Sequence, residues 1–208
     1  MALRGTNIVV IAAIAMAQVG DSDLRVIPGR RLGPVTSAST VQTLRAALGA
    51  RNVRIDSLDV GEGVTEPGVI LFPADRQRRA YVYWRDTLAF RQPLAVAIRD
   101  TGTKWMVPGP ITIGTPLAEV ERLNGRPFTF SGFDWDYGGR TIDWNGGKLS
   151  VLLGPGFQLR LTLGQRCHPR LSDSAWAEVA GDREVSSSNA AARTVCPVVE
   201  ELWLGIAP

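Results

Sequence analysis

Few side chains in this sequence could carry out catalysis. The chain has one histidine, His168, which lies beside Cys167, one of its two cysteines. No serine or cysteine forms with this histidine a sequence pattern known from catalytic dyads or triads. The motifs Gly-x-Ser-x-Gly, Gly-x-x-x-x-Gly-Lys and Gly-x-Gly-x-x-Gly are absent from the sequence. Two sulfurs and one imidazole are fewer than the four ligands of a structural zinc site. We therefore expect no catalytic residue, metal or cofactor, which makes an enzyme the less favoured class.

Three carboxylates lie close together in the sequence, at Asp134, Asp136 and Asp143. Alternate strand positions would place Asp134 and Asp136 on one face, about 7 Å apart, where they could act as a carboxylate pair or bind calcium. The simpler interpretation is the solvated face of a half-buried strand. An envelope enzyme with an unrecognised carboxylate-containing site is therefore kept as an alternative function.

Aromatic side chains are concentrated just before and around these carboxylates. Six of them fall between positions 128 and 144, namely Phe128, Phe130, Phe133, Trp135, Tyr137 and Trp144. They could form the core of a sheet beneath its helix, or some could face outward, where Trp and Tyr are favoured at binding hot spots. For the outward alternative, the residues selected are Phe133, Trp135, Tyr137 and Trp144. Phe130 and Phe133 can share a face only if a β-bulge lies near Gly132.

Composition and charge are those of a globular protein. The 208 residues are 45% hydrophobic and include 23 Lys or Arg against 20 Asp or Glu, for a net charge of +3. This fraction excludes wholesale disorder. The net charge is too small and too evenly spread to indicate nucleic-acid binding.

The N-terminus has the pattern of a secretory signal peptide over residues 1–17. Arg4 precedes an apolar run from Ile8 to Met16, and Ala15 and Ala17 provide a small-x-small cleavage site. The run is too short for a lasting membrane span, and no cysteine near it could carry a lipid anchor. We expect a periplasmic or secreted protein in which residues 18–32 form a flexible lead.

An exported chain with two cysteines favours one disulfide, here between Cys167 and Cys196. Such a bridge would close a loop of about 30 residues and stabilise the fold by roughly 3 to 4 kcal/mol on the chain-entropy estimate. The alternative is a pair of buried free thiols.

Residues 33–49 match residues 109–125 without a gap, at an offset of 76 positions. The matched pairs include Gly33 and Gly109, Pro34 and Pro110, Thr36 and Thr112, Ser39 and Thr115, and Gly49 and Gly125. In each copy the hydroxyl residue could cap a short amphipathic helix that ends at the glycine. The match predicts an internal duplication.

The segment after each predicted helix has the pattern of antiparallel strands. We expect strands over 53–60, 69–72 and 80–84 in the first copy, and over 133–137, 140–144 and 149–153 in the second. The predicted fold is α+β, with two tandem repeats at 33–108 and 109–163, each a short helix packed on an antiparallel β-meander. Residues 164–208 would form a disulfide-containing C-terminal extension with a final strand.

The second copy resembles the SmpA/OmlA-type motif of envelope assembly lipoproteins. The residues that carry the resemblance are Ile113-Gly114-Thr115, Val120, Gly125-x-Pro127 and Trp135-x-Tyr137. Two tandem helix-plus-sheet units also resemble the β-lactamase inhibitor protein. The superfamily holds mostly binding modules and assembly factors, so the resemblance implies binding rather than catalysis. The first copy lacks the Gly-x-Pro turn, because Ala50 and Arg51 follow Gly49.

The function predicted from the sequence is therefore an exported, non-enzymatic protein-binding module. The expected partner is another exported or envelope protein, and nucleic acid is not expected. A structural envelope protein is the remaining alternative, alongside the enzyme described above.

Overall fold

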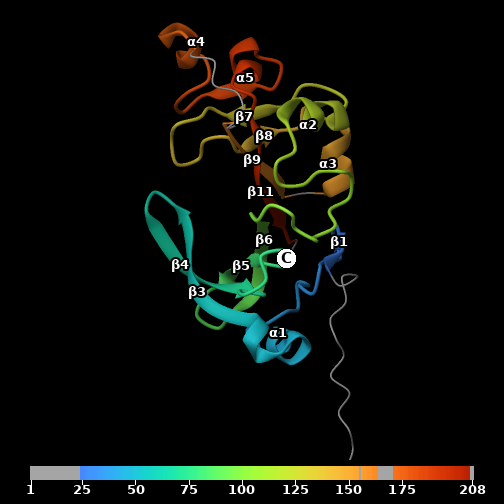
Figure 1. Cartoon of the computed structure of the whole chain (residues 1–208). Coiled ribbons are helices and arrows are strands. Elements are labelled where there is room, and N and C mark those ends of the chain that lie inside the picture. Colours follow the sequence, from blue (N-terminus) through green and yellow to red (C-terminus); the bar gives the residue numbers. More distant parts are fainter. Residues whose placement is uncertain (1–23, 155, 164–170, 207–208) are drawn as a thin grey trace, which may run out of the picture.

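The protein is an α+β chain built around a six-stranded antiparallel sheet, as a computed structural model shows (Figure 1). The structure describes residues 24–154, 156–163 and 171–206. The strands of the main sheet, in spatial order, are β3 (Val53–Gly61), β4 (Val64–Leu71), β5 (Ala80–Asp86), β6 (Arg91–Ile98), β11 (Val198–Gly205) and β9 (Phe157–Thr162).

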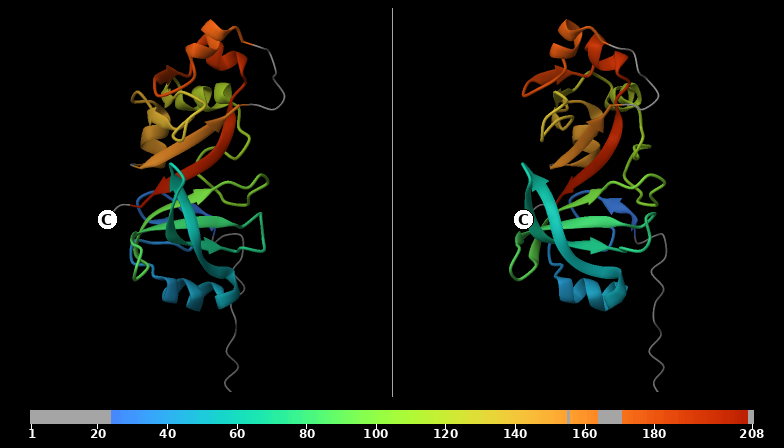
Figure 2. Two further views of the ribbon diagram at one scale, coloured as in Figure 1. Left: turned by 90° about the vertical axis from the view of Figure 1, so that its left-hand side faces the viewer. Right: turned by 60° about the vertical axis from the view of Figure 1, so that its left-hand side comes forward.

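Smaller elements surround this sheet. A three-stranded sheet has the order β10 (Glu184–Ser186), β7 (Thr129–Ser131) and β8 (Thr141–Asp143), and β1 (Val26–Ile27) pairs with β2 (Arg31–Leu32). The helices are α1 (Val41–Leu48), η2 (Ala50–Asn52), α2 (Leu117–Asn124), α3 (Lys148–Leu153), α4 (Asp173–Ala177) and α5 (Ala190–Thr194). Figures 1 and 2 place α1 with β3 to β6 at one end of the molecule and α2 to α5 at the other. Within the described ranges, no helix is long and apolar enough to span a bilayer.

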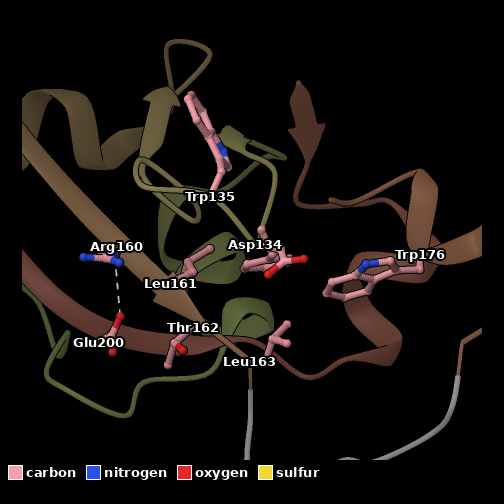
Figure 3. A pocket seen from close by; sticks show the side chains of 10 residues that line it. Asp134, Trp135, Arg160, Leu161, Thr162, Leu163, Trp176 and Glu200 are labelled. Carbon is pink, nitrogen blue, oxygen red and sulfur yellow. Dashed lines mark ion pairs between the residues drawn. The ribbon is translucent and has the colours of Figure 1, made fainter. Parts of the chain in front are cut away.

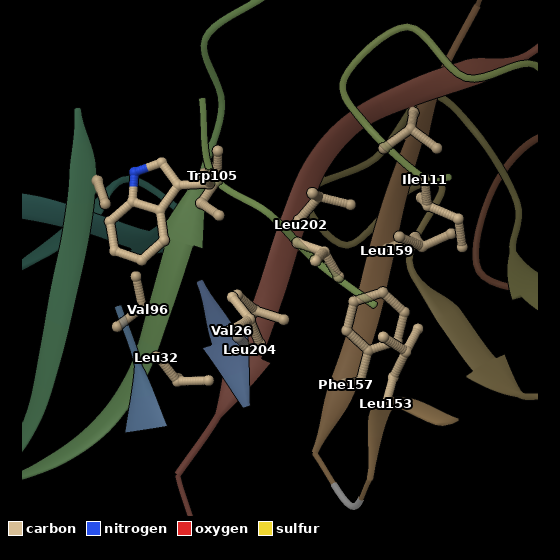
Figure 4. Packing of buried hydrophobic residues seen from close by; sticks show 14 of the residues in the cluster. Val26, Leu32, Val96, Trp105, Ile111, Leu153, Phe157, Leu159, Leu202 and Leu204 are labelled. Atoms are coloured by element: carbon tan, nitrogen blue, oxygen red, sulfur yellow. The ribbon is translucent and has the colours of Figure 1, made fainter. Parts of the chain in front are cut away.

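One face of the main sheet is covered by a hydrophobic core that runs through both ends of the molecule. Val96, Leu159, Leu202 and Leu204 point into this core, where side chains from β1, β2, α3 and the segment around Ile111 meet them (Figure 4). Because β11 pairs with β6 on one side and β9 on the other, it joins the two ends of the sheet. The final strand predicted in the C-terminal segment is present as β11, and it lies inside the main sheet between β6 and β9.

The predicted flexible lead over residues 18–32 is wrong from Leu24 onward. Leu24, Val26 and Leu32 are buried in the main core. The backbone N–H of Val26 donates to the Met106 carbonyl at 2.9 Å, which fastens this segment to the chain after β6. Alternating apolar residues in a short segment were enough to anchor it by burial.

The two matched segments have the same local geometry. The Thr36 N–H donates to Ser39 Oγ at 2.9 Å, and 76 positions later the Thr112 N–H donates to Thr115 Oγ1 at 2.9 Å. Both α1 and α2 then begin two residues after this hydroxyl residue and span eight residues. The predicted capping role was therefore one residue off: the hydroxyls of Ser39 and Thr115 close the turn before the helix, and the N-cap of α1 is Thr40.

Two of the strands predicted in the second copy, 133–137 and 149–153, are wrong. Residues 148–153 form helix α3, in which Leu149 and Leu153 are buried one turn apart while Val151 is 86% exposed. Over so short a segment, apolar residues at i, i+2 and i+4 are compatible with both a strand and a helical turn. The helix is formed because it buries Leu149 and Leu153 on one side.

Residues 132–139 form a loop, which we name the 132–139 loop, instead of the predicted aromatic strand. β7 ends at Ser131, and its register irregularity lies between Thr129 and Phe130 rather than at Gly132. Phe130 and Phe133 do share one side, with ring centroids 5.4 Å apart, because the chain leaves the strand between them. The predicted bulge near Gly132 is therefore wrong, because the strand ends at Ser131.

Two predictions fall on residues that the structure does not describe. The signal peptide, residues 1–17, lies outside the described ranges, and so does Cys167. The cleavage site and the bridge to Cys196 remain predictions.

Candidate functional site

The second face of the main sheet, which we call the open face, carries charged and aromatic side chains, and none of the described helices contributes to the hydrophobic cluster on it. In the antiparallel register Trp203 lies opposite Gln158 and Ala97, and Glu201 lies opposite Arg160, so these residues share one face while Leu202 and Leu204 point to the core. The open face consists of Tyr81, Tyr83, Arg99, Arg140, Gln158, Arg160, Glu201 and Trp203.

A buried carboxylate lies at the centre of the open face. Glu201 is only 2% exposed and forms an ion pair with Nε of Arg99, whose Nη2 donates to the Tyr83 hydroxyl at 2.7 Å. Nη1 of Arg140 lies 4.0 Å from Glu201 Oε1, and neither that oxygen nor Arg140 Nε has a hydrogen-bond partner in the part of the chain that the structure describes. Burial alone would lower the pKa of Arg99, but the Glu201 carboxylate and the Tyr83 hydroxyl raise it above its ordinary value. Arg99 therefore stays charged and links β5 to β11.

Aromatic rings pack around this charged centre. The rings of Tyr83 and Trp203 are 4.6 Å apart, and the guanidinium carbon of Arg99 lies 4.8 Å from the centre of the Tyr81 ring. The guanidinium of Arg140 lies 5.8 Å from the Trp203 ring. Tyr81 and Trp203 are each only partly buried.

The rim of the open face is formed by the β3–β4 hairpin and the 132–139 loop. The Tyr83 hydroxyl donates to the Asp59 carbonyl on β3 at 3.1 Å, and Leu58 of the same strand is buried against the face. A Cβ atom at Gly61, near the hairpin tip, would lie 3.3 Å from the Tyr137 ring, so Tyr137 packs against the tip. The hairpin and the loop meet here, although they are far apart in sequence.

The four aromatic residues predicted to bind a partner divide into two pairs. Phe133 is 4% exposed and Trp144 is 8% exposed, and Trp144 stacks on Phe157 at 5.8 Å. Buried rings offer no area to a partner, so these two belong to the core. Trp135 and Tyr137 are partly exposed at the rim, edge to face at 5.4 Å.

The three carboxylates that suggested catalysis are not brought together as a pair on a strand. Asp143 accepts a hydrogen bond from the Asn145 N–H at 2.7 Å and closes a turn, while Asp134 and Asp136 are exposed on the 132–139 loop. Among the residues that the structure describes, no group of three His, Cys, Asp or Glu side chains could hold a metal ion.

A pocket of about 470 Å³ adjoins the open face beyond Arg160 (Figure 3). The 132–139 loop, the end of β9 and helix α4 contribute residues to its lining, and it is open to solvent. Its charged and aromatic lining consists of Phe133, Asp134, Trp135, Arg160, Trp176 and Glu200. Arg160 Nε lies 3.6 Å from a carboxylate oxygen of Glu200, so these two charges largely balance each other.

The central residues of the open face were missed in the sequence, although a signal existed. Glu200 and Glu201 interrupt an otherwise apolar strand, and a carboxylate in a buried strand requires a cationic partner. The partner, Arg99, is 102 positions away, and no local pattern connects the two.

Tyr83 gives the open face a measurable dependence on pH. Burial raises the pKa of its phenol above the ordinary 10.0; Arg99 opposes this shift and Glu201 adds to it. A raised pKa in the folded state favours the neutral phenol, so this contribution to stability is complete below the unfolded pKa and is lost as the pH rises through the folded pKa. We expect the unfolding free energy from urea titrations to fall more steeply above pH 10 for the parent than for Tyr83→Phe. Equal slopes for the two proteins would contradict this assignment.

Comparison with protein-family models, curated proteins and solved structures gives no match for this chain. A functional argument therefore depends on the open face and the adjoining pocket themselves.

Proposed function

We propose that the protein is an exported, non-enzymatic binding module that docks another exported or envelope protein on the open face. The main support is the side-chain chemistry of that face, where Tyr81, Trp203 and three arginines lie together. Tyr, Trp and Arg are the residue types enriched at protein–protein hot spots. The face is also held rigid by the Tyr83–Arg99–Glu201 contacts, which lowers the entropy cost of binding.

The fold proposed for this module consists of two tandem repeats, each with a short helix and antiparallel strands. Their relation is supported by two isolated bridges. Thr40 bridges Arg91, the first residue of β6, and Pro116, 76 positions later, bridges Val198, the first residue of β11. In this proposal β6 and β11, with eight residues each, are equivalent strands of the two repeats.

The register between β6 and β11 supports the same proposal. Ile98 pairs with Leu202 and Ala95 pairs with Gly205, so the eighth residue of each strand faces the fifth residue of the other. A two-fold rotation that exchanges the two strands requires such reciprocal pairing. The open face would then be a composite surface with a contribution from each repeat, and Trp203 and Ala97, which pair beside the centre of this register, would lie close to the axis.

Export and the disulfide are part of the proposal. The support for both is the sequence: a charged, then apolar, then small-residue N-terminus, and two cysteines in a chain with that pattern. The partner would accordingly be found in the same compartment, the periplasm or the extracellular medium.

A blocking substitution tests the docking surface with little risk to the fold. Gln158 is exposed on β9 and pairs with Trp203 in the sheet register, so Gln158→Trp places a large ring over the open face. The matched variant Gln42→Trp adds the same ring to the exposed side of α1. This helix packs on the core side of the main sheet, opposite the open face. We expect residues 18–208 to capture a specific partner from envelope extract, and Gln158→Trp to reduce the captured amount about tenfold while Gln42→Trp leaves it unchanged.

Two outcomes would contradict the proposed function. Equal capture by all three proteins would show that the partner binds elsewhere, and no specific partner for the parent would remove the support for a binding module. Circular dichroism and urea titration of each variant confirm that the comparison is between folded proteins.

A further inference from the structure

The pocket beside the open face differs from it in charge. The pocket contains two carboxylates, Asp134 and Glu200, and one arginine, Arg160, which is already paired with Glu200. Asp134 makes no hydrogen bond or ion pair with any residue in the described ranges. Among the described residues, the lining therefore has one negative charge without a partner, next to a face that carries three arginines.

From this pocket we infer the chemistry of the partner: its docking segment inserts a lysine or arginine side chain between Asp134 and Trp176. The inference rests on the proposed function, since it concerns a protein bound on the open face. It adds the requirement that this protein carry an exposed cationic side chain beside the surface that contacts Trp203 and Tyr81.

The aromatic wall of the pocket suits a cation. Trp176 is partly buried on α4, and Figure 3 shows the carboxylate of Asp134 pointing toward its indole ring. A guanidinium or ammonium group placed between them would form an ion pair with the carboxylate and lie close to the indole, a cation–π contact. Leu161 and Leu163 line the same space and would contact the aliphatic stem of the inserted side chain.

The two recognition groups are held at a fixed separation by the backbone. The Val179 N–H donates to the Trp176 carbonyl at 2.9 Å, and the Phe133 N–H donates to the Val179 carbonyl at 2.7 Å. Residue 134 follows directly, in a left-handed conformation with φ of 66°, which Asp tolerates better than most residues. Trp135 is fixed by a hydrogen bond from its Nε1 to the Gly132 carbonyl at 2.9 Å. The site is therefore formed before a ligand arrives, and little ordering cost is expected on binding.

The test uses capped peptides that differ only in charge. Acetyl-Gly-Arg-Gly-amide is titrated into residues 18–208, and the ¹H–¹⁵N signal of the Trp176 indole is followed by NMR. The matched probe has citrulline in place of arginine, which keeps the shape of the side chain and removes its charge. We expect a saturable shift with the arginine peptide and binding at least about tenfold weaker with the citrulline peptide, as for loss of a charged hydrogen bond.

Variants locate the charge that is recognised. Asp134→Asn removes the carboxylate and keeps a residue type that adopts the left-handed conformation, so the loop geometry is preserved. The control Asp136→Asn removes a neighbouring exposed carboxylate that does not line the pocket. We expect Asp134→Asn to weaken binding of the arginine peptide about tenfold and Asp136→Asn to leave it unchanged.

Three results would overturn the inference. Equal binding of the citrulline peptide would exclude recognition of charge, and unchanged binding by Asp134→Asn would place the cation elsewhere. Tighter binding of free arginine than of the capped peptide would indicate a small-molecule ligand instead of a protein side chain. Gln158→Trp does not change the pocket lining, so failure of the capture experiment and failure of the peptide experiment can be told apart.

Discussion

Glu201→Ala is expected to lower the unfolding free energy by about 3 to 5 kcal/mol, the cost of breaking a buried ion pair by removing one partner. The substitution leaves the charged guanidinium of Arg99, whose side chain is only 32% exposed, without its carboxylate. It also removes the anion closest to Arg140, so two like charges would face each other across the open face. Urea unfolding of parent and variant at neutral pH measures the difference.

The adjacent residue provides a matched control. Glu200 is one position away on the same strand, but its side chain is 49% exposed and its contact with Arg160 is at 3.6 Å. Exposed pairs contribute about 0 to 1 kcal/mol, because water screens the charges and the side chains lose entropy. Glu200→Ala should therefore be nearly neutral. A loss of less than about 1 kcal/mol for Glu201→Ala as well would show that its ion pair with Arg99 does not hold β11 to the first half of the sheet.

Local sequence patterns predicted those elements of the fold that are stabilised by residues close together in the sequence. The helices after Ser39 and Thr115 formed at the predicted offset because caps, apolar spacing and terminal glycines all lie within about ten residues of one another. The α+β class was correct for the same reason. The position of β11 was not predictable in this way, since its place between β6 and β9 depends on pairing across about 40 to 110 positions of sequence.

The candidate site was only partly predictable. Part of the aromatic cluster around Trp135 lies at the rim of the open face, but the same residue types occur in the core and on the surface, and burial separates Phe133 from Trp135. The Glu201–Arg99 pair and the pocket at Asp134 are formed by residues from distant segments. Periodicity does not identify such contacts, because they depend on how the strands are ordered.

Gly139→Ala, at the end of the 132–139 loop, is expected to destabilise the protein by about 2 to 5 kcal/mol. About 1 to 2 kcal/mol of this comes from the strain of a left-handed alanine, and about 1 to 3 kcal/mol comes from overpacking. Gly139 has φ of 75°, and a Cβ atom there would lie 1.9 Å from the Leu161 carbonyl oxygen. Its N–H donates to the Ser131 carbonyl at 2.8 Å, and its carbonyl accepts from the Leu161 N–H at 2.8 Å. This glycine thus joins the loop to both β7 and β9, and no side chain fits between them.

Gly181→Ala separates the two causes of that loss. Gly181 has φ of 81°, but nothing lies within 4 Å of the Cβ position, so only the strain of about 1 to 2 kcal/mol is expected. Because a Cβ atom at residue 139 would clash with the Leu161 carbonyl oxygen, Gly139→Ala should lower the unfolding free energy in urea more than Gly181→Ala does. Equal losses for the two variants would contradict this close contact. We expect relief of the clash to move the 132–139 loop away from β9, which would separate Asp134 from Leu161 in the pocket lining. A folded Gly139→Ala protein should therefore bind the arginine peptide more weakly than Gly181→Ala, so the close packing of a glycine would control the geometry of the proposed cation site.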